Sequence, residues 1–94
     1  MRNLTLAVVL LSAAGPVSAQ PVAPPGATAC SGCHGAPGGN VAVPSLSGQS
    51  AENIVAAMQA YRSGERAATV MDRIAKGFSD DETRAIAAWL AERR

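Results

Sequence analysis

The feature that most restricts how this chain can fold is the run Cys30-Ser31-Gly32-Cys33-His34, which holds both cysteines and the single histidine of the sequence. A Cys30–Cys33 disulfide would close a loop too short to constrain the unfolded chain much. A thioredoxin-like redox pair would need a βαβ context, and a zinc site would lack a fourth Cys or His ligand. These alternatives stay open, but Cys-x-x-Cys-His is the pattern of covalent haem attachment, which we favour.

The small size of the chain supports this interpretation. The sequence has 94 residues and only three aromatic side chains, Tyr61, Phe78 and Trp89. A domain of this size buries too small a fraction of its surface for comfortable stability, so it usually needs an additional stabilising element. A large, planar and apolar cofactor would fill the core directly. We therefore expect one covalently bound haem c.

Residues 1–19 are typical of a secretory signal peptide. Arg2 gives a positive start, an apolar run follows from Leu4 to Ala14, and small residues precede a cleavage site after Ala19. The run is shorter than the roughly 20 apolar residues of a membrane span, although an uncleaved anchor helix is the alternative. We expect a periplasmic protein, secreted across the inner membrane, with no membrane span after cleavage.

The rest of the chain divides into a flexible, proline-rich leader at residues 20–25 and one domain at residues 26–94. Of the eight basic residues, Arg2 is removed with the signal peptide, which leaves seven against seven acidic residues. A formally neutral domain with interleaved charges has no basic stripe for nucleic acid. We therefore exclude nucleic acid as a partner.

The domain is predicted to be all-α, with three to four helices packed around the haem. We expect a first helix over Gly26 to Cys33, a long loop over residues 35–48, and a second helix from Ser50 to Arg62 that stops at Gly64. A short helical segment around residues 70–75 is closed by Gly77, and the capping-box sequence Ser79-Asp80-Asp81-Glu82 opens a last helix.

Two residues are candidates for the sixth iron ligand if His34 is the fifth. His34 would use one ring nitrogen, and a carbonyl of the loop, held rigid by Pro44, would accept from the other. Met58 lies on the apolar face of the second predicted helix, where methionine is usually core filling. Met71 begins a short, irregular segment between two helices, which suits a side chain aimed at a metal. We favour Met71.

These residues resemble the class I cytochrome c family over residues 26 to 93. The resemblance implies that Cys30 and Cys33 form the thioethers and that His34 is the proximal ligand. It also implies that the Pro44 carbonyl holds His34 and that Met71 is the distal ligand. Trp89 falls where the C-terminal helix of the family packs an aromatic residue against its first helix.

A finer similarity lies in residues 61–65 and 69–79, which resemble the monohaem cytochrome subunit of flavocytochrome c sulfide dehydrogenase. The resemblance implies an electron carrier that is not itself an enzyme, with no catalytic residues. Its partners would be an FAD-containing sulfide dehydrogenase subunit and another cytochrome. Alternatives are a free-standing carrier of the c553 or c4 type, a haem enzyme or gas sensor with an open iron site, and a haem-free periplasmic thiol–disulfide protein.

Overall fold

The computed structural model describes residues 14–16, 22–36 and 38–93. This part of the chain contains four helices and no strand: α1 (Ala27–His34), α2 (Ala51–Ser63), α3 (Met71–Ala75) and α4 (Asp80–Ala91). The all-α prediction is confirmed. None of the helices in these ranges is long and apolar enough to cross a membrane.

Most of the predicted signal peptide, residues 1–19, lies outside the described residues. The predicted leader, residues 20–25, is described from Val22 onward, and it touches the domain. Ala23 packs against the core, and the Pro24 carbonyl accepts a hydrogen bond of 3.1 Å from the Ala27 N–H. Contact with the core therefore begins a few residues before the predicted domain start at Gly26.

Local signals in the sequence set both ends of α2. The Ser50 hydroxyl accepts a hydrogen bond of 3.1 Å from the Asn53 N–H, which satisfies one of the free amides of the first turn. At the other end, Gly64 adopts a left-handed conformation with φ of 82°, a region that glycine enters at little cost. The predicted cap and stop of this helix are both confirmed.

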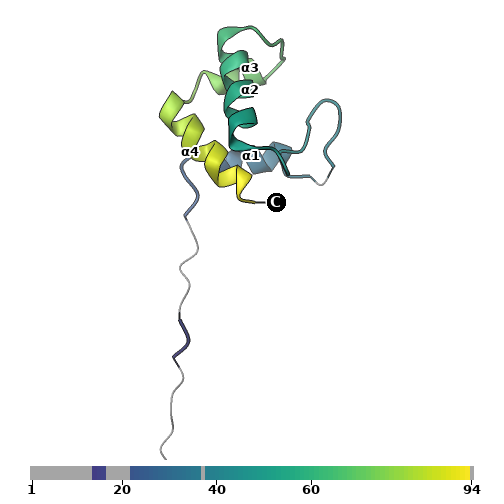
Figure 1. Cartoon of the computed structure of the whole chain (residues 1–94). Coiled ribbons are helices and arrows are strands. Elements are labelled where there is room, and N and C mark those ends of the chain that lie inside the picture. The colour runs from purple at the N-terminus through teal and green to yellow at the C-terminus, as the bar shows by residue number, and fades with distance from the viewer. Residues whose placement is uncertain (1–13, 17–21, 37, 94) are drawn as a thin grey trace, which may run out of the picture.

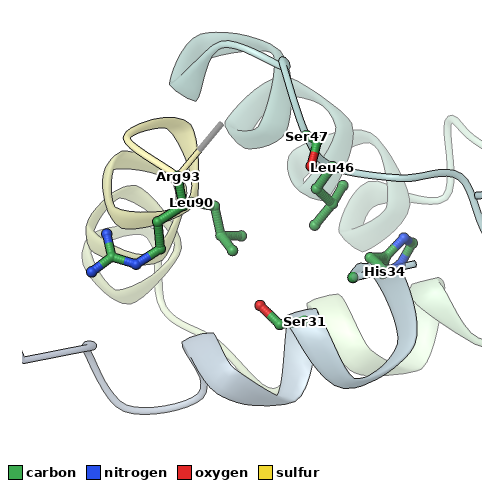
Figure 2. A pocket seen from close by; sticks show the side chains of 7 residues that line it. Ser31, His34, Leu46, Ser47, Leu90 and Arg93 are labelled. Carbon is green, nitrogen blue, oxygen red and sulfur yellow. The ribbon is translucent and has the colours of Figure 1, made fainter. Parts of the chain in front are cut away.

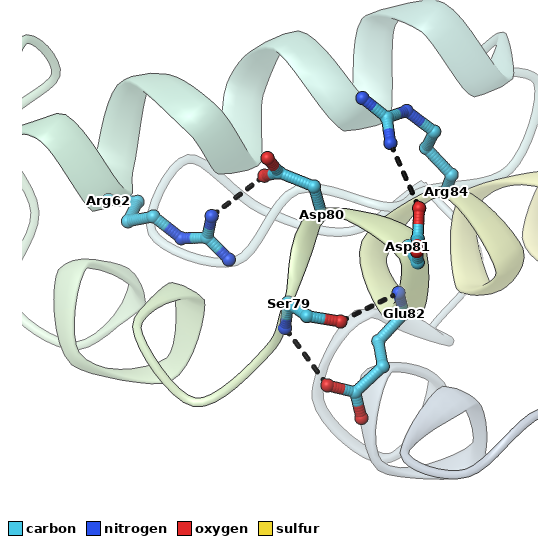
Figure 3. Close-up of polar contacts among 6 residues, drawn as sticks. All are labelled: Arg62, Ser79, Asp80, Asp81, Glu82 and Arg84. Atoms are coloured by element: carbon cyan, nitrogen blue, oxygen red, sulfur yellow. Dashed lines mark hydrogen bonds and ion pairs between the residues drawn. The ribbon is translucent and has the colours of Figure 1, made fainter.

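The N-terminus of α4 is closed by a reciprocal capping box, drawn in Figure 3. The Ser79 hydroxyl accepts from the Glu82 N–H at 3.1 Å, and a Glu82 carboxylate oxygen accepts from the Ser79 N–H at 2.9 Å. Figure 3 also shows Arg62, at the end of α2, paired with Asp80 of α4 at 2.7 Å. Both partners are partly exposed, so this pair contributes only about 0–1 kcal/mol.

The helices pack around α2 and α4. α2 lies against both α4 and α3, while α1 lies against α4 at the end of the domain where α2 begins (Figure 1). The loop between α1 and α2 extends to one side of this group (Figure 1). α1 and α3 therefore occupy different parts of the domain.

The core is small. It joins three helices through Ile54 of α2, Ala27 of α1, and Ile86, Ala87 and Leu90 of α4. Phe78 and Trp89 pack against this cluster but stay partly exposed. Among the described residues no large side chain is more than 98 % buried. This agrees with the expectation that the chain alone supplies little core.

We predict that Ser79→Ala destabilises the domain by about 1 kcal/mol, because the substitution removes the N-cap acceptor of α4. The free energy of unfolding of the haem-loaded protein, measured by denaturant titration at neutral pH, checks this value. Ser63→Ala is the control, because the Ser63 hydroxyl lies at the end of α2 and caps no helix N-terminus. An equal loss in the control would contradict the role given to the capping box.

We also predict that Glu82 makes the free energy of unfolding decrease as the pH is lowered into the acid range. The Ser79 N–H and then the Ser79 hydroxyl hold the pKa of this carboxyl below its ordinary value. Because the pKa is lower in the folded state, the ionised carboxyl stabilises the folded protein at pH values above the ordinary glutamate pKa of about 4.3. This stabilisation is lost as the pH falls through the folded-state pKa. Wild type should therefore be more stable than Glu82→Gln at neutral pH, and the difference should vanish in acid. A constant difference across this range would refute the prediction.

Candidate functional site

The two cysteines lie on one side of α1. They are three residues apart, so their side chains are neighbours on the helix surface. Both thiols are free. Cys33 is exposed, whereas Cys30 is half-buried, packs against the core and has its sulfur 3.6 Å from the Gly26 carbonyl oxygen. Burial raises the pKa of the Cys30 thiol. The helix thus presents two unequal thiols from a single turn.

His34 is the last residue of α1, and its ring is fixed by the loop. The Nδ1 atom lies 2.6 Å from the carbonyl oxygen of Pro44. A carbonyl only accepts hydrogen bonds, so Nδ1 carries the proton and donates. In the neutral ring the Nε2 atom is then unprotonated and has a free lone pair. This is the tautomer that ligates a metal through Nε2.

The loop is also attached to the main chain at His34. The Leu46 N–H donates to the His34 carbonyl at 3.4 Å, and the Gln49 side chain donates to the Ser45 carbonyl at 3.2 Å. Pro44 lacks an N–H and has a fixed φ, which limits how its own carbonyl can turn. The two residues that follow Pro44 are therefore hydrogen-bonded to His34 at the start of the loop and to Gln49 at its end.

The two methionine candidates occupy different elements. Met71 is the first residue of α3, and Met58 lies within α2; both are half-buried. α1 and α3 do not contact each other within the described ranges, so His34 and Met71 belong to separate elements that are joined through α2 and α4. Such an arrangement leaves the two side chains free to face a group from different directions.

A small pocket borders α1. Figure 2 shows Ser31 and Leu90 pointing into the space between α1 and α4, with Leu46 and Ser47 of the loop on a third side. Its volume is about 60 Å³, enough for a few water-sized molecules and too small for a tetrapyrrole. The guanidinium of Arg93 points outward (Figure 2).

Trp89 of α4 is partly buried beside the core. The indole packs against the core cluster that contains Ala27 of α1, and the Arg93 guanidinium stacks over its ring with 3.7 Å between the Cζ atom and the centroid. Arg93 also donates to the Trp89 carbonyl at 3.2 Å, which satisfies a carbonyl of the last turn of α4. Trp89 therefore adds apolar contact at the edge of the core that joins α1, α2 and α4.

The donor groups fit a covalently bound haem better than the alternatives. Two free thiols share one turn, and the adjacent histidine has the tautomer that ligates through Nε2. Across the described ranges, no group of three or more His, Cys, Asp and Glu side chains is arranged to hold a metal ion, which gives no support to a zinc site. The free thiols likewise give no support to a structural disulfide.

Sequence reasoning missed one feature of the site, the turn that follows Gly39. The Asn40 side chain accepts hydrogen bonds from the Ala42 N–H at 2.9 Å and the Val43 N–H at 2.8 Å. The signal was present as Gly38-Gly39-Asn40, since glycine and asparagine favour such turns. The turn is connected to His34 because it ends at Val43, next to Pro44, whose carbonyl accepts from the imidazole.

Comparison with known proteins agrees with these observations. The family described as "Cytochrome C oxidase, cbb3-type, subunit III" matches residues 26–90. The chain is 43% identical over 61 residues to a protein named cytochrome subunit of sulfide dehydrogenase, from Chlorobaculum tepidum. That match covers 64% of this chain and 56% of the relative, so the chain spans about half the length of that protein.

Two further relatives are similar over comparable lengths. Cytochrome c-554(548) of Halomonas halodenitrificans is 40% identical over 65 residues, which is 64% of this chain and 78% of the relative. The thiosulfate dehydrogenase electron acceptor of Stutzerimonas stutzeri is 40% identical over 67 residues, which is 66% of this chain and 31% of the relative. With its all-helical fold and Cys-x-x-Cys-His sequence, the chain belongs to the family described as cbb3-type cytochrome c oxidase subunit III and is a class I c-type cytochrome.

Proposed function

We propose that this cytochrome is a periplasmic electron carrier that holds one haem c through Cys30 and Cys33, with His34 and Met71 as the axial iron ligands. The haem, when bound, supplies an iron that cycles between the ferrous and ferric states. The chain contributes the attachment points, the two ligands and the apolar surroundings. Residues 1–19 would direct the protein across the inner membrane.

The observation that carries this proposal is the 2.6 Å contact between His34 Nδ1 and the Pro44 carbonyl oxygen. It leaves the unprotonated Nε2 atom, with its free lone pair, directly after the helical turn that carries both cysteines. A carbonyl acceptor on the other ring nitrogen orients a ligand histidine and increases its basicity. Within the proposal, the Pro44 carbonyl keeps the ring in the orientation in which Nε2 would stay bound to the iron in both oxidation states.

Met71 is the better proposed sixth ligand because of where its element begins. It stands at the N-terminus of the short helix α3, next to the exposed residue Val70, whereas Met58 is held between neighbouring turns of α2. A thioether ligand raises the reduction potential and keeps the iron six-coordinate in both oxidation states. An iron with two permanent protein ligands transfers electrons without binding substrate.

For the physiological role we propose the cytochrome subunit of a sulfide-oxidising flavocytochrome, since the relative from Chlorobaculum tepidum is named cytochrome subunit of sulfide dehydrogenase. The donor would be an FAD-containing sulfide dehydrogenase subunit and the acceptor another cytochrome. A free-standing carrier is the second candidate. It is favoured by the cytochrome c-554(548) match, which covers 78% of that relative.

Two measurements test these proposals separately. The mass of the purified periplasmic protein reports signal cleavage and covalent haem together, and a haem-free mass would refute the attachment proposal. Affinity purification of the tagged protein from its own cells then separates the two roles. Stoichiometric recovery of a flavoprotein supports the subunit, and recovery of the cytochrome alone supports the free carrier.

We predict that the double substitution Cys30→Ala with Cys33→Ala prevents accumulation of the protein in the periplasm. The buried apolar cluster is small and includes two alanines, so the chain without its haem lacks enough core to resist proteolysis. Immunoblotting of periplasmic extracts measures the loss. Ser31→Ala, which keeps both cysteines and His34, is the control and should accumulate normally. A folded, haem-free double variant at wild-type abundance would contradict the prediction.

We predict different outcomes for the two methionines. Met71→Leu keeps the side-chain bulk but deletes the sulfur, so the ferrous protein should bind carbon monoxide and its reduction potential should fall. Met58→Leu should cost less than about 1.5 kcal/mol of stability and leave the absorption spectrum unchanged. Visible spectroscopy with and without carbon monoxide checks both. A thioether-ligated spectrum in Met71→Leu would exclude Met71, and its loss in Met58→Leu would identify Met58 instead.

A further inference from the structure

The loop between α1 and α2 contains a turn built around Asn40. The Asn40 side-chain oxygen accepts from the N–H groups of Ala42 and Val43 at 2.9 and 2.8 Å, and the Asn40 N–H donates to the Val43 carbonyl at 3.1 Å. Three hydrogen bonds to one residue therefore fix the chain up to Val43. The next residue is Pro44, whose carbonyl accepts from His34.

Gly39 lies directly against the peptide that follows Pro44. Its φ is 54°, in the left-handed region, and a Cβ atom placed there would meet the Ser45 nitrogen and would lie 2.8 Å from the Pro44 carbonyl carbon. Real Cβ atoms essentially never approach other atoms so closely. The absence of a side chain at Gly39 is what lets the loop fold back onto the Pro44–Ser45 peptide.

These local contacts, rather than burial, hold the turn at Asn40–Ala42. Asn40, Val41, Ala42 and Pro44 are all exposed, and the Val41 side chain is fully exposed at 105%. An exposed loop gains little from apolar packing. On the side that precedes Pro44, the direction of its carbonyl therefore depends on the hydrogen bonds of Asn40 and on the close approach at Gly39, while Ser45 and Leu46 hold the side that follows it.

We propose that Gly39 and Asn40 are positioning residues for His34, and that they tune the reduction potential of the haem through the Pro44 carbonyl. This inference rests on the proposed role of His34 as an iron ligand. A well-aligned acceptor draws the Nδ1 proton away from the ring and makes Nε2 a stronger donor, which stabilises ferric iron. Loosening the turn weakens that hydrogen bond, so the reduction potential should rise.

The test uses four variants of the haem-loaded protein. Asn40→Ala deletes the acceptor of two loop amides, and Asn40→Asp retains it. Gly39→Ala places a methyl group against the Pro44–Ser45 peptide. Gly38→Ala is the matched control, because Gly38 also has a positive φ, of 74°, but no atom lies within 4 Å of a Cβ placed there.

Two quantities are measured for each variant: the reduction potential and the solvent-exchange rate of the His34 Nδ1 proton by NMR. The potentials are taken at high ionic strength, which screens the charge that Asn40→Asp adds. Asn40→Ala and Gly39→Ala should raise the potential and accelerate exchange. Asn40→Asp and Gly38→Ala should stay near wild type in both measurements.

Several results would overturn the inference. It fails if Asn40→Ala leaves both quantities unchanged, or if Gly38→Ala shifts them as much as Gly39→Ala does. Where a variant loses its haem, the same comparison applies: loss confined to Asn40→Ala and Gly39→Ala supports the inference, and equal loss in all four overturns it. A wild-type protein without thioether-bound haem would instead refute the proposed function itself.

Discussion

The hydrogen bond from His34 Nδ1 to the Pro44 carbonyl is the interaction on which the rest of the site depends. It joins the end of α1 to Pro44, an exposed residue in the middle of the loop between α1 and α2. It also decides the tautomer of the single histidine in the chain. Without it, α1 would still present two thiols, but the adjacent imidazole could rotate and protonate at either nitrogen. The hydrogen bond thereby fixes the imidazole at the end of α1 in one orientation.

The helices themselves depend on signals at their ends more than on a large core. Ser50, Gly64 and Ser79 each satisfy backbone groups that a helix terminus leaves free. The apolar core then packs these helices, whose ends the capping residues define, against one another. Local residues therefore specify where these helices begin and end. The proposed cofactor would complete the interior between them.

The sequence predicted the helices closely because capping is local chemistry. The Ser79 to Glu82 box and the Gly64 stop need no knowledge of tertiary contacts, and the predicted start of α1 differs from the observed one by a single residue. The contact between Pro44 and His34 followed from the resemblance to class I cytochromes. The connection between the turn at Asn40 and His34 could not be predicted, since it depends on how Gly39 packs against the Pro44–Ser45 peptide, several residues away in the sequence. The choice of Met71 over Met58 stays a prediction, because the two sulfur atoms differ in their supporting elements and not in their chemistry.

The ion pair between Arg62 and Asp80 has a consequence for the segment that begins with Gly64 and ends with Ser79. The pair lies at 2.7 Å where the end of α2 meets the start of α4, so this segment, which includes α3, leaves and rejoins the packed α2–α4 pair at neighbouring points. The entropy of closing such a loop grows only slowly with its length, by about 0.6 kcal/mol for each doubling. The rule applies to the exposed residues 64–67 at the start of the segment, whereas α3 packs against α2 and buries Ala75. The length of the connection can therefore vary at its exposed start while α3, which carries Met71, keeps its contact with α2.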